Sequence, residues 1–325
     1  MDTLSEVLVN LRPSGALVDR SLLTAPWAVC LEAGRSITVA AMLEGRAWLL
    51  RDGIDPVPLG PRDLVVVTGR EGALLADDPS GSAAPFCTVT PRGVEEVGTG
   101  RLLEGPWRGP ASPASAGRPE ESEEGEGPVL LTGSFPTSGR IAGRLLEALP
   151  PVLHVPREAQ SSHALELVED ELSARRPGRE AMLDRLLDIL LIAALRDGLA
   201  LPDVEAPAWF DASSDPVVGP ALAAMHADPG RQWTVGALAA TALVSRATFA
   251  RRFAELMGEP PISYLAGWRL CLGADLLQER DDTLESIARQ VGYSSAYAFS
   301  AAFAREYGTR PSRYRTQSRR TAGAG

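Results

Sequence analysis

The stretch "LVSRATFARRF", residues 243–253, places a serine in front of a helical pattern that carries two phenylalanines. A second stretch, "GYSSAYAFSAAF" at 292–303, has the same arrangement about fifty residues later. In each stretch the two aromatic residues lie one helical turn apart: Phe249 with Phe253, and Phe299 with Phe303. Such self-similarity indicates one supersecondary unit that is used twice.

The repeat is longer than these two stretches. Residues 234–258 align with residues 283–308, and the offset grows by one residue past a central turn. Each copy offers a threonine as a helix N-cap, a short helix, a turn, a serine as a second cap and a glycine after a longer helix. The caps and terminators that we predict are Thr234, Ser245 and Gly258 in the first copy, and Thr283, Ser294 and Gly308 in the second. This order is typical of a helix-turn-helix.

The predicted second helix of each copy has an inner face with phenylalanines and an outer face that is open for contacts. Arg246, Ala247, Ala250 and Arg251 point outward in the first copy, and Ser295, Ala296, Tyr297 and Ser300 in the second. A generic helical hairpin would have the same phenylalanine spacing, but two copies with matching caps favour the helix-turn-helix. Between the copies, the pattern of residues 260–279 predicts one long helix, which would act as a rigid spacer between the two helix-turn-helix units.

Charge is distributed unevenly along the 325 residues. The formal net charge is −10, which argues against nonspecific nucleic-acid binding by the whole chain. From residue 230 onward there are 13 arginines and 8 acidic residues, a net charge of +5, so the remainder carries about −15. There is no lysine, which we attribute to a GC-rich genome. Only the C-terminal segment therefore has the charge that nucleic acid requires.

Cysteine usage and the N-terminus predict the compartment. Three cysteines are too few and too scattered for a disulfide framework or a structural zinc, which fits a reducing cytoplasm. The first fifteen residues have acids where a signal peptide needs a basic start, and the most apolar helix is interrupted by Asp188, Arg196 and Asp197. We expect a cytoplasmic protein with no membrane segment.

The N-terminal half predicts a β-rich domain that is followed by helices. Residues 36–90 contain short apolar runs broken by glycine and proline, the pattern of a small roll or barrel. Residues 108–127 have no aliphatic side chain larger than alanine, so we predict a disordered insertion. From residue 139 to 200 leucines recur three and four apart, as in amphipathic helices. We assign residues 1–200 to this domain, 201–214 to a linker and 317–325 to a disordered tail.

One of these helices, within residues 179–200, has an unusually broad apolar surface. This apolar surface is wider than packing on one small barrel needs, so its additional face predicts a dimer interface. Simple core packing is an equal alternative. The candidate dimerisation residues are Leu183, Leu186, Leu187 and Leu190.

With these motifs, the chain resembles the AraC family of bacterial transcription regulators. The match runs through "WTVGALA", "SRATFARRF", "GEPPISYLAGWRL", "IARQVGYSS", "AFSAAF" and "GTRPSRYR", within residues 215–316. The resemblance implies an all-α DNA-binding domain with two helix-turn-helix units, double-stranded operator DNA and RNA polymerase as partners, and a homodimer. The expected DNA-binding residues are Ser245, Arg246, Ala247, Ala250, Arg251, Arg252, Ser294, Ser295, Ala296, Tyr297, Ser300 and Arg313.

The N-terminal half resembles, more loosely, the cupin-type sensor domain of one branch of that family. The matching stretches include "LTAPWAVCLEAG", "VAAMLEGRAWL" and "LGPRDLVVV". The resemblance implies an α+β chain with a cupin-like β-barrel that senses a small-molecule effector, without catalysis and without a cofactor. Where the family commonly has an arginine, this chain has Ala301, which assigns more of the DNA binding to the first copy.

The chain also departs from metal-binding cupins. The stretches that would carry their histidine ligands read "SITVAAMLEG" and "VTGREG", with Gly72 where the last histidine would fall. The three histidines, His154, His163 and His226, lie outside these strands, so we expect no metal site.

Two alternatives stay open at the level of sequence. The first is a cupin enzyme or small-molecule binding protein with an appended helical domain, against which the missing metal ligands argue. The second is a redox switch that uses Cys30 and Cys87 in the sensor half. Cysteines in apolar surroundings such as "AVCLE" and "PFCTV" are more often buried and inert.

Overall fold

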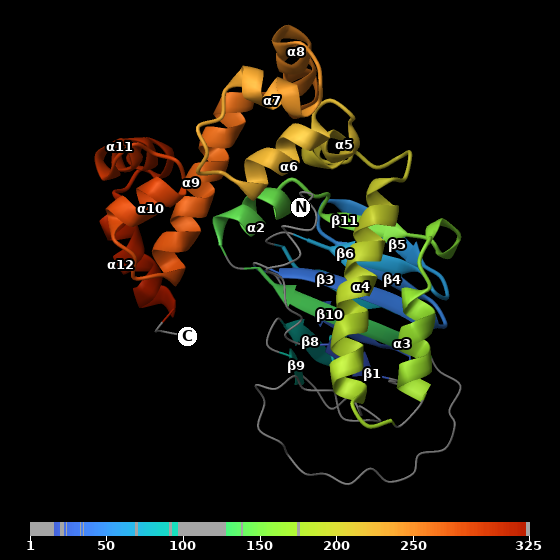
Figure 1. Ribbon diagram of the computed structural model, residues 1–325. Helices are drawn as coiled ribbons and strands as arrows, with labels where there is room; N and C mark the ends of the chain where they lie inside the picture. The colour runs from blue at the N-terminus through green and yellow to red at the C-terminus, as the bar shows by residue number, and fades with distance from the viewer. Residues whose placement is uncertain are drawn as a thin grey trace. The chain divides into compact units, whose positions relative to one another are not determined.

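The computed structural model divides the chain into two units. It describes residues 16–19, 23, 25–32, 34, 36–68, 71–90, 93–96, 128–137, 139–173 and 176–322, so the predicted insertion at 108–127 lies outside the described residues. The first unit contains the strands and two long helices, and the second consists of helices from residue 206 onward together with residues 139–145. Each unit is shown in Figure 1. The expected α+β fold class is confirmed.

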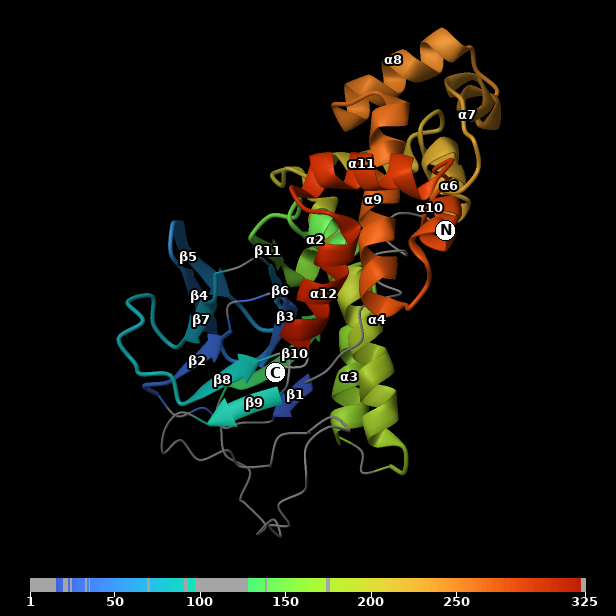
Figure 2. The ribbon, with the colours of Figure 1, turned by 90° about the vertical axis from the view of Figure 1, so that its left-hand side faces the viewer.

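The strands form two sheets. One sheet has the order β1(Ala16–Asp19), β10(Val129–Pro136), β3(Ser36–Glu44), β6(Leu64–Val67), β11(Val152–Val155). The other has the order β5(Ile54–Leu59), β4(Ala47–Arg51), β7(Ala73–Ala76), β2(Ala28–Leu31), β8(Cys87–Thr90), β9(Gly93–Glu96), which can be followed in Figure 2. The strands pair in antiparallel fashion, except that β2 and β8 run parallel.

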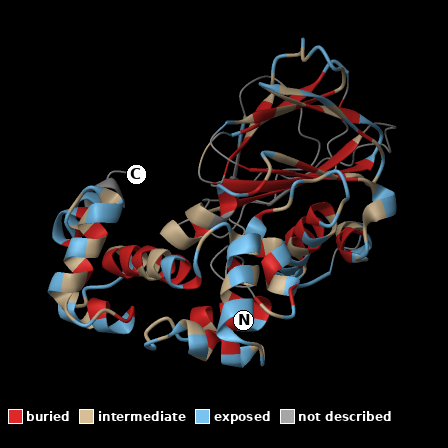
Figure 3. Ribbon diagram, turned by 90° about the horizontal axis from the view of Figure 1, so that it is seen from above, coloured by how far each residue is buried: buried red, intermediate tan, exposed pale blue. Residues whose placement is uncertain are grey.

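Strand β3 is buried along both faces because it lies between two packed layers. Ala40 and Met42 belong to the apolar cluster that fills the space between the sheets, together with Leu49 and Leu75 of the second sheet. A strand covered on both faces reads as a continuous apolar run, which is why "SITVAAML" does not alternate. Figure 3 shows this concentration of buried residues on the strands.

Helices α3(Ala164–Ser173) and α4(Arg179–Leu199) cover the other face of the first sheet (Figures 1 and 2). The close approach is possible at Gly133, where an added Cβ would lie 3.1 Å from Leu187 Cδ2. The four leucines that we assigned to a dimer interface are at most 6% exposed: Leu183, Leu186, Leu187 and Leu190. That assignment is wrong, because these side chains are buried within the strand-rich unit itself, where Leu187 contacts the sheet at Gly133.

The remaining elements of this half are short. Helix α2(Arg140–Leu146) follows β10, and the 3-10 turn η1(Arg157–Ala159) follows β11. None of the described helices is long and apolar enough to cross a membrane.

The helical unit has eight helices after residue 206. They are α5(Ala208–Ser214), α6(Gly219–Ala227), α7(Val235–Thr241), α8(Arg246–Met257), α9(Pro261–Glu279), α10(Leu284–Gln290), α11(Ala296–Tyr307) and α12(Pro311–Ala322). Two boundaries differ from the sequence prediction. Helix α5 occupies the second half of the predicted linker and packs in this unit, and α12 is helical through residues 317–322, where we predicted a disordered tail.

Candidate nucleic-acid interface

The first helix pair, α7 and α8, is built as the sequence predicts. Thr234 Oγ1 accepts a hydrogen bond from the Ala237 amide at 3.1 Å, and Ser245 Oγ accepts one from the Thr248 amide at 3.1 Å. Gly258 ends α8 in the left-handed conformation, at φ 71°. Phe249 and Phe253 are fully buried, so the opposite face of α8 is the exposed one.

The second pair, α10 and α11, has the same construction with one correction. Thr283 Oγ1 accepts from the Ser286 amide at 3.2 Å, but the cap of α11 is Ser295, whose Oγ accepts from the Ala298 amide at 3.2 Å. We predicted Ser294 as this cap. Ser294 is instead the one residue by which the second turn is longer.

The backbone of the two turns explains the shift. Val244 N donates to Ala239 O at 3.2 Å, and Tyr293 N donates to Ala288 O at 2.8 Å, so the two turns have the same hydrogen bond up to that point. In the second copy Ser294 then precedes the cap. Ser295 is therefore occupied as a cap, whereas we expected it to point outward.

The outward faces of the two second helices differ in chemistry. On α8, Arg246, Ala247 and Arg251 are exposed and Ala250 is partly buried. On α11, Tyr297 is 85% exposed and Ala301 is also exposed, whereas Ala296 and Ser300 are partly buried. Arg313 is exposed on α12. The first copy thus presents arginines, and the second presents an aromatic hydroxyl and small side chains.

Arg252 has a partner inside the protein. Its Nε and Nη2 donate to Asp215 Oδ2 at 2.9 and 2.6 Å, while Asp215 Oδ1 accepts from the amides of Val217 and Val218 at 2.9 Å each. Burial raises the pKa of Asp215, but the hydrogen bonds from Arg252 and the two amides outweigh it, so the pKa lies below its ordinary value. Arg252 thus holds α8 to the α5–α6 turn, a structural role that competes with the DNA contact we predicted for it.

The long helix α9 carries the two pairs on separate aromatic clusters. In the first half, the His226 ring stacks on Trp268 at 3.9 Å, and its Nε2 lies 2.8 Å from the Tyr264 hydroxyl. Burial, with a smaller contribution from the positive charge of Arg144, lowers the pKa of His226 to about 3. In the second half the Phe299 ring packs against Gly273, where an added Cβ would lie 2.7 Å from that ring. His226 is thus a neutral structural residue.

The strand-rich unit contains a groove of about 550 Å³ on the outer face of its second sheet. Its floor is a row of three partly buried side chains on neighbouring strands, Cys30, Leu74 and Leu50. The turn at Gly81 closes over the row, and an added Cβ there would lie 2.7 Å from Leu50 Cδ1. The groove is therefore apolar at its floor and open at its side.

Geometry argues against a direct disulfide between the two candidate redox cysteines. Cys87 is fully buried between the sheets and is paired with Val29 on the adjacent strand, so Cys30 lies on the opposite face. A disulfide would require one strand to shift or turn over. None of the three cysteines, all of which lie in the described part of the chain, forms a disulfide.

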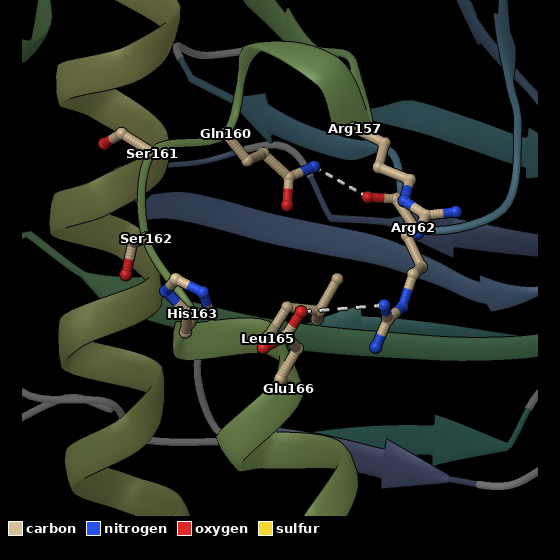
Figure 4. Close-up of a pocket in the computed structure, with 8 residues that line it drawn as sticks. All are labelled: Arg62, Arg157, Gln160, Ser161, Ser162, His163, Leu165 and Glu166. Carbon is tan, nitrogen blue, oxygen red and sulfur yellow. Dashed lines mark hydrogen bonds and ion pairs between the residues drawn. The ribbon is translucent and has the colours of Figure 1, made fainter.

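A second, smaller pocket of about 120 Å³ lies where α3 begins (Figure 4). Arg62 lines it, but its guanidinium is bound by Glu169 and lies 3.8 Å from Glu166, so its charge is neutralised. The histidines do not converge here or elsewhere: His163 lines this pocket, His154 Nε2 lies 3.1 Å from Asp63 Oδ2, and His226 is in the helical unit. Among the described residues, no group of histidine, cysteine, aspartate and glutamate side chains could hold a metal ion.

Two tandem helix-turn-helix units on a shared helix, in a chain that also has a two-sheet domain, define a transcription regulator with a DNA-binding domain. A family model described as "Cupin" matches residues 2–200, and one described as "Helix-turn-helix domain" matches residues 238–317. The chain belongs to the AraC family of transcription regulators.

Relatives over the full length carry that family name. A putative AraC-like transcription regulator of Streptomyces lividans is 34% identical over 97% of this chain and 98% of the relative, and one of Streptomyces antibioticus is 31% identical over the same shares. The regulator AlkR of Acinetobacter baylyi is 38% identical over 54% of this chain and 58% of its own length. The crystal structure of the DNA-binding domain of AdpA with a target DNA is similar at 33% identity and a TM-score of 0.33, covering 34% of this chain and all of that one. These relatives are named as regulators, not as enzymes.

Proposed function

We propose that this regulator reads an asymmetric, bipartite DNA site with α8 and α11. The observation that carries the proposal is the pair of matched caps and buried phenylalanines, which turn one exposed face of each helix outward at the two ends of α9. Two such helices on one rigid spacer both reach bases only when they enter the major groove on the same face of the duplex. Their contacts then lie about one helical turn, roughly 10 base pairs, apart.

The two boxes of the site differ in how strictly they are read. Arg246 and Arg251 give α8 side chains that can donate to guanine edges, and each good contact contributes about 1–3 kcal/mol of discrimination. Helix α11 offers Tyr297 and Ala301 at its surface, so its box is read by apolar and hydroxyl contacts and tolerates more base changes. We expect Ser294, which precedes the start of α11, and Arg313 on α12 to contact phosphates, whereas Ser245 is occupied as a helix cap in the same way as Ser295.

The test uses full-length protein and a duplex selected from a random-sequence pool. Arg251→Ala should lose discrimination at one base position, and inserting about 5 base pairs between the boxes should abolish binding, because it turns them to opposite faces. Arg196→Ala, an exposed arginine of α4, is the control for loss of one positive charge. Unchanged specificity in Arg251→Ala would refute the assignment of α8 as the main reader.

We propose a homodimer through the outer face of α3 and α4. With the four leucines buried, the exposed apolar side chains of this helix pair are Leu167, Met182 and Ile189, which are 47–52% exposed. Adjacent apolar side chains on a helical surface favour burial against a second copy. A dimer formed here can bind two bipartite sites as direct repeats. We also expect the DNA-bound dimer to contact RNA polymerase. This contact can be measured as retention of the polymerase together with the dimer on operator DNA.

We propose that the signal is an apolar small molecule that binds the groove over Cys30, Leu50 and Leu74. Its volume, about 550 Å³, lies within the range of small-molecule sites, whereas the space between the sheets is filled by the apolar cluster. A thermal-shift screen of small apolar compounds, run in parallel on the wild type and on Leu74→Trp, tests this proposal. The tryptophan side chain fills the groove, so a compound that binds there should stabilise only the wild type. A stabilising compound that acts equally on Leu74→Trp would place the effector elsewhere.

A further inference from the structure

Helix α2 belongs by sequence to the sensor half and by packing to the DNA-binding unit. It lies between β10 and β11 and inside the segment that matches the cupin family. Residues 139–145 nevertheless group with the helices that follow residue 206. A segment that is covalently part of one unit and packed in the other is suited to carry a signal between them.

The N-terminus of α2 is capped by a carboxylate from α9. Asp275 Oδ1 accepts from the Arg140 amide, and Asp275 Oδ2 accepts from the Ile141 amide at 3.1 Å. These amides are among those that a helix start leaves without an internal partner. Burial raises the pKa of Asp275, and the two amides oppose that shift. Both carboxylate oxygens of Asp275 thus accept hydrogen bonds from backbone amides of α2.

Two arginines of α2 contact the two halves of the helical unit. Arg140 Nε donates to the Tyr314 hydroxyl at 3.0 Å, and its guanidinium lies 5.1 Å from the Tyr307 ring centroid. Arg144 Nη2 donates to Glu259 at 3.1 Å. Tyr307 and Tyr314 belong to the second half of the unit and Glu259 to the first, so α2 bridges both helix-turn-helix units.

Two glycines make room for this contact. Gly139 has a φ of 87°, and an added Cβ would lie 2.8 Å from Asp275 Oδ2. Gly267 of α9 faces Arg144, where an added Cβ would lie 2.7 Å from Nη1. None of the partners of α2, which are Asp275, Glu259, Tyr307 and Tyr314, is among the outward residues of α8 and α11.

We infer that α2 is a coupling clamp: docked through Asp275 and Arg140, it fixes the relative placement of the two helix-turn-helix units that the bipartite DNA site requires. The inference rests on the proposed function. Because β10 and β11 flank α2 in the chain, a change in the sensor sheet acts on DNA affinity by tightening or releasing this contact. Asp275 and Arg140 are positioning residues and do not contact DNA.

The test measures docking and DNA binding separately, on the full chain. Hydrogen exchange of the α2 amides reports docking without DNA, and Asp275→Ala should abolish the protection of the Arg140 and Ile141 amides. Affinity for the selected duplex should fall by about 5–150-fold, the usual range of coupling between sites, and preference for its native box spacing should weaken. Arg140→Ala, which leaves α9 intact, should act in the same direction, and Asp211→Ala on the exposed face of α5 is the control.

The outcomes distinguish the clamp from the DNA-binding proposal. Unprotected α2 amides in the wild type, or wild-type affinity and spacing preference in Asp275→Ala after protection is lost, would overturn the clamp alone. A wild-type protein that selects no duplex would overturn the proposed reading of DNA and the clamp with it.

Discussion

The Arg252 guanidinium donates both of its bonds to Asp215 Oδ2, a carboxylate whose side chain is only 6% exposed. Since Asp215 Oδ1 also accepts the amides of Val217 and Val218, one side chain joins the end of α5, the start of α6 and the middle of α8. The residue that anchors the recognition helix is thus an aspartate outside the repeated motif.

We expect Arg252→Ala to destabilise the helical unit by about 2 kcal/mol, because it leaves a buried carboxylate without its cation. The salt dependence of DNA binding should stay as in the wild type, since no phosphate contact is removed. Denaturant unfolding and a salt titration measure the two effects. A shallower salt slope with unchanged stability would support the predicted DNA contact of Arg252 instead.

Leu186→Asp and Ile189→Asp form a matched pair on α4. Leu186 is 6% exposed, so a charge there should cost more than about 3 kcal/mol and unfold the strand-rich unit. Ile189 is 47% exposed, so Ile189→Asp should stay folded and lose the dimer. Circular dichroism and sedimentation decide, and a folded dimer in Ile189→Asp would remove the proposed interface.

Leu243→Gly should stabilise the protein. Leu243 is 94% exposed and has a φ of 56°, at the turn position where the second copy has Gly292 at φ 82°. A left-handed residue with a side chain costs about 1–2 kcal/mol, and the flexibility of unfolded glycine offsets about 0.5–1 kcal/mol. We expect a net gain of about 0.5–1 kcal/mol, measured by denaturant unfolding. Gly292→Leu should destabilise, and equal losses in both variants would argue for a packing role of Leu243.

His226 predicts an acid-dependent loss of stability in the helical unit. Its folded pKa of about 3 lies below the ordinary 6.5, so the unfolded state binds the proton more readily between these values. Stability is therefore fully present above pH 6.5 and falls as the pH drops toward 3, by about 2 kcal/mol between pH 7 and 5. His226→Gln should lack this part of the pH dependence, as followed by fluorescence of the stacked Trp268. Parallel profiles for the two proteins would show that the pKa of His226 is the same in the folded and unfolded states.

One thiol per chain should react quickly with a maleimide under native conditions. Cys30 is partly exposed at the floor of the groove, whereas Cys87 is fully buried and Cys271 is 9% exposed. Cys30→Ser should remove the fast phase, as mass spectrometry of labelled peptides will report. Equal labelling of Cys87 would mean that the sheet opens on the timescale of the reaction.

Several features could be read from the sequence because they depend on neighbours within one or two helical turns. The caps at Thr234, Ser245 and Thr283 bond to amides three residues ahead, and the buried phenylalanines recur at helical spacing. The sequence was less informative at Ser294 and Ser295, where two adjacent serines compete for one cap and only the backbone of the turn selects between them.

The sequence of α4 did not indicate which of its apolar faces packs in the core and which lies at the surface. Its leucines and isoleucines nearly encircle the helix, and both a core and a dimer interface produce that pattern. The sheet beside it decides, because Leu187 enters the space that Gly133 leaves and Ile189 does not.

The sequence by itself determined the tandem repeat, the two helix-turn-helix units and the strand-rich N-terminal half, since periodicity and capping are local. Only the tertiary structure decided that Arg252 binds Asp215, 37 residues away, and that Asp275 caps α2, 135 residues away. A charged side chain carries no local sign of a distant partner. Its role is set by the chain folding that brings a buried carboxylate to a guanidinium or to the amides at a helix start.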